Sequence, residues 1–124
     1  METFQATRTM QTTTQVDFVD ITNDVQEALG RSAIRNGHVT VFTTTPKCAL
    51  IVNEYETGLL ADLRRTFARM ESRGEPTGRT LLGASSVVLP AVAGRLRLGM
   101  WQRVLLVEHD GPEERGVVVQ IVGE

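Results

Sequence analysis

The side chains that most often bind metals or act as nucleophiles are scarce in this sequence. Among its 124 residues are two histidines, His38 and His109, and one cysteine, Cys48. Zinc needs three or four imidazole, thiolate or carboxylate ligands that converge tetrahedrally. These three residues do not provide an intact histidine site within one chain, so we predict neither a metal site nor a bound cofactor.

Each of the three residues also has a structural interpretation. Cys48 begins the apolar stretch Ala49-Leu50-Ile51, which predicts a small core side chain. No neighbouring base is visible that would activate it as a nucleophile. His38 opens a predicted strand and is expected at the surface or as a capping group. His109 precedes Asp110-Gly111 and is expected to pack at the end of a hairpin.

Two short polar and aromatic pairs are candidates for a binding site. The only Trp of the chain, Trp101, is followed by Gln102 and an apolar run. Trp101 is interpreted as a packing or subunit-interface residue, or else as a pocket wall. A buried Gln must find a hydrogen-bond partner, so Gln102 is a candidate ligand contact. Asn53 and Glu54 either serve a pocket or cap the following helix.

Composition excludes several classes of protein. With 13 basic and 15 acidic residues the net charge is -2, which does not favour nucleic acid as a partner. A lone cysteine fits a reducing cytoplasm. No apolar stretch approaches the roughly 20 residues that cross a bilayer. Polar groups interrupt the N-terminal segment where a signal peptide needs an apolar core. We therefore predict a cytoplasmic protein that binds no membrane.

Strand-forming residues dominate the chain, and two segments show helical spacing. The clearest helix is 58–70, with one apolar stripe made of Leu59, Leu60, Leu63, Phe67 and Met70. The other is expected to start at Thr22 as N-cap and to end at Asn36-Gly37. The predicted strands are one or two within 3–19, then 38–42, 49–53, 85–89, 101–108 and 116–122, with turns at 93–94 and 110–112.

The last predicted strand is apolar on both faces, so it should be central in its sheet. Runs of strands with two inserted helices predict an α+β fold. We expect a single domain, residues 1–124, with a mostly antiparallel sheet of several strands and two main helices.

The order and spacing of several motifs resemble the YjbQ family. The motifs are Asp20-Ile21-Thr22, Gly37–Phe42, Asn53-Glu54 with Gly58-Leu59-Leu60, Leu81-Leu82-Gly83, Gly99-Met100-Trp101-Gln102 and Asp110-Gly111-Pro112. Members of this family are described as secondary thiamine-phosphate synthases. The resemblance implies a YjbQ-like fold, which covers most of the chain, and a homotrimer.

The departures from the family pattern are equally informative. After Phe42 the family continues into Pro-His-Thr-Thr, whose histidine helps to build a metal site, whereas this chain has 44-Thr-Thr-Pro-Lys-47. The family's longer loop after the second helix carries several histidines and an Asp-Gly-Asn element. Here the predicted loop 71–78 leads directly into Arg79-Thr80-Leu81-Leu82. The resemblance therefore implies that the metal site has been lost.

Basic residues stand at positions that would border the family's pocket. Lys47, Arg79 and Arg103 could hold a phosphate or carboxylate in place of the cation, or they are solvated surface residues. The candidate ligand-binding residues are therefore Lys47, Asn53, Glu54, Arg79, Trp101, Gln102 and Arg103.

Two functions of different classes follow from these observations. One is a weak or vestigial synthase that joins a thiazole phosphate to a pyrimidine pyrophosphate, chemistry that normally relies on a divalent cation to stabilise the leaving group. The other is a non-catalytic trimeric scaffold, or a binder of a small phosphate- or carboxylate-bearing ligand. The missing histidines favour the second.

Overall fold

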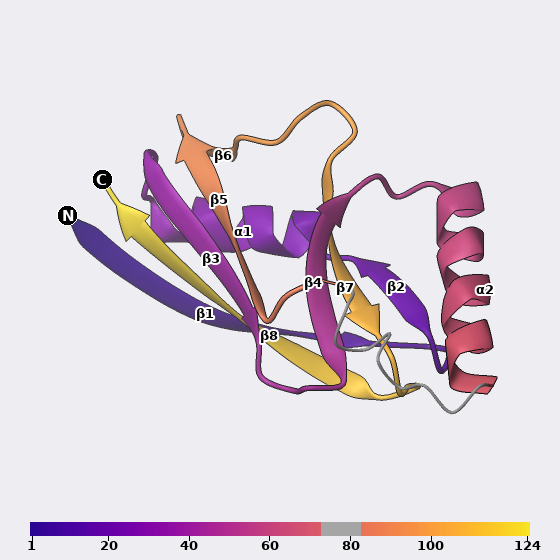
Figure 1. Ribbon diagram of the computed structural model, residues 1–124. Coiled ribbons are helices and arrows are strands. Elements are labelled where there is room, and N and C mark those ends of the chain that lie inside the picture. The colour runs from indigo at the N-terminus through magenta and orange to yellow at the C-terminus, as the bar shows by residue number, and fades with distance from the viewer. Residues whose placement is uncertain (73–82) are drawn as a thin grey trace.

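Two antiparallel sheets and two helices make up the part of the protein that the structure describes (Figure 1). The computed structural model describes residues 1–72 and 83–124. Its elements are β1 (Glu2–Gln11), β2 (Asp17–Asp20), α1 (Thr22–Ser32), β3 (Gly37–Thr43), β4 (Cys48–Asn53), α2 (Thr57–Ser72), β5 (Ser86–Val92), β6 (Arg95–Leu96), β7 (Arg103–Glu108) and β8 (Glu114–Gly123). The predicted α+β class is confirmed. The segment 3–19 contains two strands, and most of the predicted loop 71–78 lies outside the described residues.

The strands form a larger and a smaller sheet. The order in the larger one is β1-β8-β3-β5-β6, and in the smaller one β2-β7-β4. β8 lies between β1 and β3, so the prediction that the last strand is central is correct. Its two faces differ, however: Val117, Val119 and Ile121 are buried, while Gln120 is exposed. The strand with neither face open to water is β7, in which Val104 to Val107 are inaccessible.

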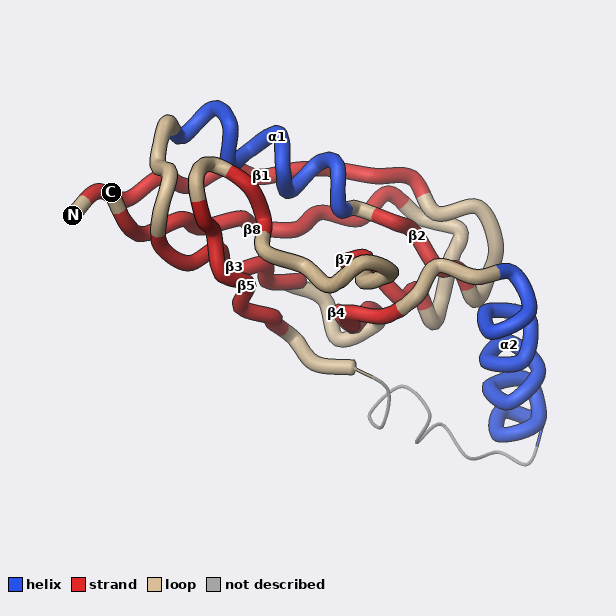
Figure 2. The backbone as a smooth tube through the Cα atoms, turned by 90° about the horizontal axis from the view of Figure 1, so that it is seen from above, coloured by secondary structure: helices blue, strands red, loops and turns tan. Residues whose placement is uncertain are grey.

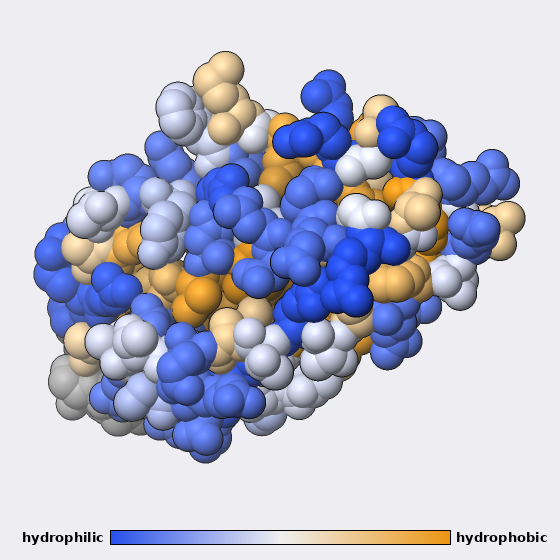
Figure 3. Space-filling view, turned by 180° about the vertical axis from the view of Figure 1, so that it is seen from behind, coloured by the Kyte–Doolittle hydropathy of each residue, from blue (hydrophilic) through white to orange (hydrophobic). Residues whose placement is uncertain are grey.

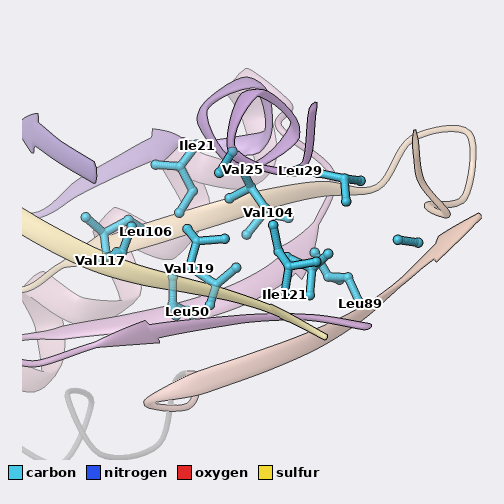
Figure 4. Close-up of a cluster of buried hydrophobic side chains, with 14 of the residues drawn as sticks. Ile21, Val25, Leu29, Leu50, Leu89, Val104, Leu106, Val117, Val119 and Ile121 are labelled. Carbon is cyan, nitrogen blue, oxygen red and sulfur yellow. The ribbon is translucent and has the colours of Figure 1, made fainter. Parts of the chain in front are cut away.

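The main core lies on one face of the larger sheet. Alternate residues of β3, β5 and β8 meet side chains from α1, β4 and β7 there, as their period-two spacing requires. Figure 4 shows Ile21, the residue before α1, and Val25 of α1 close to Val104 of β7. A second, smaller cluster joins the opposite face of the small sheet to α2. Figure 2 shows α2 at the end of the molecule, next to β2.

The second cluster confirms the stripe predicted on α2 for all its residues except Leu59, which is not part of the cluster. Leu60 and Phe67 are buried against Phe18 of β2, with the Phe18 and Phe67 rings stacked at 6.5 Å. The Arg64 guanidinium lies 5.3 Å from the centre of the Phe18 ring, at a distance typical of a cation–π contact. His109 presents an edge to Phe67 at 5.0 Å and is buried. Its predicted role as a packing group at the hairpin end is confirmed.

Both ends of α1 differ from prediction. The N-cap is Ile21, which makes no side-chain capping bond. The Thr22 hydroxyl instead accepts the Val104 N–H at 2.8 Å and donates to Asp20 Oδ1 at 2.7 Å, because β7 passes beside it. The helix ends at Ser32, where Ala33 adopts a left-handed conformation with φ 60°. The sequence offered no glycine signal at that position.

The predicted turn at Ala93-Gly94 is confirmed as the tight connection between β5 and β6. Val92 pairs with Arg95, so the loop between the two strands consists only of Ala93 and Gly94. Both have positive φ, 53° and 79°. Two successive positive φ values match the twist of an antiparallel hairpin. A glycine tolerates this conformation easily, whereas Ala93 adopts it at some cost in strain.

A buried carboxylate ties the two sheets together at one end of β7. Glu108 has no exposed surface. Arg115 of β8 donates to both of its oxygens, at 2.7 and 3.1 Å, and the Thr12 hydroxyl donates at 2.9 Å. Burial alone would raise the pKa of Glu108, but these donors and the Asp110 N–H outweigh it and hold the pKa below its ordinary value.

Cys48 packs against this carboxylate. Its thiol is buried and lies 3.5 Å from Glu108 Oε2. Burial, together with the negative charge of Glu108, raises the pKa of the thiol to about 12. A thiol that stays protonated is a poor nucleophile, so the interpretation of Cys48 as a core side chain is confirmed.

The surface mixes polar and apolar groups. Figure 3 shows the side on which α1 lies, where hydrophilic residues prevail and apolar ones appear between them. No helix of residues 1–72 and 83–124 covers the outer face of the larger sheet, which exposes Phe42, Val88 and Val92. Across the described residues, neither helix has the length and apolar character needed to cross a bilayer.

Replacing Glu108 should destabilise the protein strongly and change its response to acid. Glu108→Gln leaves Arg115 buried without its counter-charge, at a cost of about 3 kcal/mol near neutral pH. Because the folded pKa is lowered, the stabilisation is complete above the usual value of about 4.3 and is lost as the pH falls through the folded value. Urea unfolding at about pH 7 and about pH 3 measures both effects. Glu114→Gln, at an exposed carboxylate, is the control, and a pH-independent gap between wild type and Glu108→Gln would contradict the assignment.

Candidate functional site

Pairing between β4 and β7 brings several candidate residues to one end of the small sheet. Asn53, the last residue of β4, lies opposite Arg103, the first residue of β7. The chain then runs from β4 to α2 through 54–56, and it reaches β7 through the turn 99–102. Figures 1 and 2 both show these two connections side by side. Two cavities open beside them and share Met100 and Arg103.

The larger cavity, called here the Trp101 cavity, has a volume of about 500 Å³. Two aromatic side chains line it, Tyr55 and Trp101, which are 51% and 70% exposed. The remaining lining residues are Asp20, Glu54, Glu56, Met100 and Arg103. The two aromatic rings come from different connections, so this wall exists only in the folded chain.

The smaller cavity, called here the Arg95 cavity, has a volume of about 200 Å³ and lies where α1 begins. Arg95 and Arg103 supply its positive charge, and Asn23, Gln26 and Gln102 supply amides. Gln26 also fixes the hairpin next to it, donating to the Gly94 carbonyl at 3.0 Å and accepting the Leu96 N–H at 2.9 Å. No carboxylate of the described residues pairs with Arg95, so its guanidinium is available to an anion.

A short network holds Arg103 between the two cavities. Its Nε donates to Asp20 Oδ2 at 2.7 Å, and one terminal nitrogen reaches Asn23 Oδ1 at 3.4 Å. Burial would raise the pKa of Asp20, but hydrogen bonds from Thr22 and Arg103 outweigh it and hold the pKa below its ordinary value. Asp20 is therefore ionised at neutral pH and compensates most of the charge of Arg103.

The capping group of α2 is Glu56. Its two carboxylate oxygens accept the backbone N–H groups of Gly58 and Leu59, at 2.9 and 2.7 Å, and these bonds lower its pKa. Asn53 uses its side-chain oxygen to accept the Glu54 N–H at 2.8 Å. Of the two candidates Asn53 and Glu54, neither caps the helix and only Glu54 lines the cavity.

Gln102 is positioned by its own turn. Its Oε1 accepts the Gly99 N–H at 2.8 Å, while its backbone N–H donates to the Gly99 carbonyl at 3.1 Å. The turn delays the start of β7 to Arg103, two residues later than predicted, and leaves Trp101 outside the strand. The oxygen of Gln102 is thus already used, whereas the side chain still borders the Arg95 cavity.

The remaining basic candidates lie elsewhere. Lys47 precedes β4 at the end opposite Asn53, so it is roughly 20 Å from Arg103 along the strand. Its ammonium pairs with Asp110 at 3.1 Å. Arg79 lies outside the described residues. The described part of one chain therefore brings Glu54, Trp101, Gln102 and Arg103 together and does not bring Lys47 to them.

Sequence reasoning did not single out Asp20, Tyr55, Glu56, Arg95 or Met100. Asp20 and Met100 stand in the motifs Asp20-Ile21-Thr22 and Gly99-Met100-Trp101-Gln102, and Tyr55, the only tyrosine, directly follows Asn53-Glu54. Adjacency to a recognised motif was the one available signal. Among the described residues, no three His, Cys, Asp or Glu side chains lie close enough to hold a metal ion. The donor set of these residues does not fit the histidine metal site of the family.

Comparison with known proteins agrees with the fold. The sequence model for UPF0047 protein YjbQ-like matches residues 6–124. A UPF0047 protein of Archaeoglobus fulgidus is 35% identical over 90% of this chain and 96% of its own length. The crystal structure of a YbjQ-like protein of unknown function from Sulfolobus solfataricus superposes with a TM-score of 0.89 at 31% identity, over 99% of each chain. A hypothetical protein from Aeropyrum pernix gives 0.83 at 34% identity, over 100% of each chain.

Removing the side-chain oxygen of Gln102 should loosen the turn that presents Trp101. Gln102→Ala loses the bond to the Gly99 N–H, which we expect to cost about 1 kcal/mol, and Gln102→Glu keeps an acceptor. Urea unfolding followed by the fluorescence of the single Trp measures stability and the environment of Trp101 together. Unchanged stability and emission in Gln102→Ala would show that the bond does not position the turn.

Proposed function

Because this chain belongs to the YjbQ-like UPF0047 family, we propose that it binds a small phosphate- or carboxylate-bearing molecule and makes little or no thiamine phosphate. The observation that carries this proposal is the Arg95 cavity. It combines the Arg95 guanidinium, with which no carboxylate of the described residues pairs, a second guanidinium fixed by Asp20, and the amides of Asn23 and Gln102. Guanidinium groups bind phosphate and carboxylate through paired, charge-assisted hydrogen bonds.

The weakness of catalysis follows from the donor set. Joining a thiazole phosphate to a pyrimidine pyrophosphate expels pyrophosphate, whose charge a divalent cation normally stabilises. The carboxylates nearest the cavities already have other uses: Asp20 accepts from Arg103 and Thr22, and Glu56 caps α2. Arginines that bind substrate and transition state alike do not accelerate the chemical step.

Lys47 and Arg79 remain part of the proposal as further cations. Lys47 could reach a ligand beside Arg103 only from another subunit, because within one chain the whole length of β4 separates the two. A homotrimer, which the family resemblance implies, would provide such a neighbour. The buried Cys48 thiol fits the proposed cytoplasmic location.

The exposed outer face of the larger sheet supports assembly. Val88 is 62% exposed, Val92 50% and Phe42 43%, all on the side opposite the core. Burying such apolar area between copies is favourable, at about 25 cal/mol per Å². Closed symmetric oligomers are the common way in which a chain covers such a face.

Phosphate binding should depend on Arg95 and Arg103. Calorimetric titration with inorganic phosphate should give an affinity that falls about tenfold in Arg95→Ala and in Arg103→Ala, and that weakens as salt is raised. Arg31→Ala, at an exposed arginine near the C-terminus of α1, should have no effect. Equal affinities for Arg95→Ala and wild type would reject the Arg95 cavity as the anion site.

Thiamine-phosphate formation should stay close to the enzyme-free background, even with added magnesium. The product can be measured by fluorescence after oxidation to thiochrome. Robust turnover that survives chelation and disappears in Lys47→Ala would mean that basic groups have replaced the metal in catalysis, and the proposal would be wrong.

The homotrimer is tested by light scattering at micromolar concentration. We expect a trimeric mass for the wild type and a smaller one for Val88→Glu, because a carboxylate in a buried apolar contact is strongly unfavourable. Ala68→Glu, on the exposed side of α2, should remain trimeric. Trp101→Ala should also dissociate if Trp101 lies at a subunit contact, whereas a trimeric Trp101→Ala assigns this residue to the cavity. A monomeric wild type would contradict the proposal.

A further inference from the structure

We propose that the Trp101 cavity is a site for a small organic cation, such as a quaternary ammonium group. This site is distinct from the Arg95 cavity and would take a ligand of the opposite charge. Two independent features of its lining lead to this inference: the aromatic faces that it offers, and the sign of its charge.

The aromatic residues come first. Tyr55 and Trp101 are the only tyrosine and the only tryptophan of the chain, and both line this cavity. Each is more than half exposed, at 51% and 70%, so folding alone does not use their surfaces. The face of an aromatic ring attracts a cation, most strongly for Trp, and paired rings are the usual way to recognise quaternary ammonium groups. The exposed Met100 thioether adds a polarizable wall beside them.

The charge of the lining points the same way. Three carboxylates and one guanidinium border the cavity, which leaves a surplus of negative charge. Asp20 compensates Arg103 at 2.7 Å, and the carboxylate of Glu56 faces the first N–H groups of α2. Within the described part of the chain, no hydrogen bond or ion pair occupies the carboxylate of Glu54. Glu54 is therefore the group available to neutralise a bound cation.

The volume suits a ligand of this class. About 500 Å³ is within the range of small-molecule sites and far exceeds what a single metal ion needs. A quaternary ammonium also has no N–H donor, so it needs aromatic and apolar contact together with a nearby negative charge. Tyr55, Trp101, Met100 and Glu54 supply this combination, whereas Arg95 lies outside the lining.

Choline is a suitable probe because a neutral molecule of nearly the same shape exists. Titration with choline chloride at constant ionic strength, followed by the fluorescence of the single Trp, should give a saturable change. We expect the affinity for choline to be at least about fivefold higher than that for 3,3-dimethylbutan-1-ol, which lacks the charge. Equal affinities for the two, or a change that does not saturate, would overturn the proposal.

Variants separate the contributions and keep this test apart from that of the anion site. Glu54→Gln and Tyr55→Ala should each weaken choline binding about threefold to tenfold, while Tyr55→Phe, which keeps the ring, should remain close to wild type. Glu114→Gln, which removes an exposed carboxylate from β8, is the matched control and should bind choline normally. Arg95→Ala should weaken phosphate binding about tenfold without affecting choline. An unchanged choline affinity in Glu54→Gln, or equal losses in Glu54→Gln and Glu114→Gln, would contradict a specific cation site.

Discussion

The buried carboxylate of Glu108 is the interaction on which the rest of the structure depends. It stands at the end of β7, the strand whose apolar residues are inaccessible on both faces. A charge there must be matched, and the partners come from elsewhere in the chain: Arg115 of β8, Thr12 after β1 and the thiol of Cys48 at the start of β4. The network therefore joins the small sheet to the larger one at this end, and one missing partner leaves a buried charge unsatisfied.

The opposite end of β7 carries the candidate site. Arg103 begins the strand and is fixed by Asp20 at the end of β2, while Thr22 joins that carboxylate to the backbone of Val104. β7 therefore has an ion pair at each end: the buried pair of Glu108 with Arg115 at one end, and the partly exposed pair of Arg103 with Asp20 at the other. Because β4 runs antiparallel to β7, its end at Asn53 leads Glu54 to the site, while its start places Cys48 at the Glu108 anchor. This geometry explains why Lys47 and Arg103 lie apart although both flank paired strands.

Two cavities that share Arg103 nevertheless differ in sign. Asp20 compensates the guanidinium, so Arg103 contributes oriented donors more than net charge to either side. The unshared residues decide the character of each cavity: Arg95 on one side, and Glu54 with the two aromatic rings on the other. A carboxylate such as Glu56, whose oxygens both accept backbone N–H groups, contributes less to recognition than its exposure suggests.

Much of the secondary structure could be predicted from the sequence alone. The apolar stripe of α2, the Ala93-Gly94 turn and the central position of β8 depend on local spacing, and all three are confirmed. Local spacing also identified Cys48 as a core residue. The α+β class followed from the order of these elements, and the family from the order of its motifs.

Tertiary structure decided the features that depend on distant partners. Thr22 has the residue type of an N-cap, yet its hydroxyl bonds to Asp20 and to β7, because a strand remote in sequence passes beside it. Gln102 closes a turn and so shortens β7, and Glu56 rather than Asn53 or Glu54 caps α2. Tyr55 meets the cavity of Trp101 only because β4 and β7 pair in one register. Residue types and spacing therefore determined which elements form, while the pairing of distant strands decided which side chains share a site, since hydrogen bonding and burial act between neighbours in space.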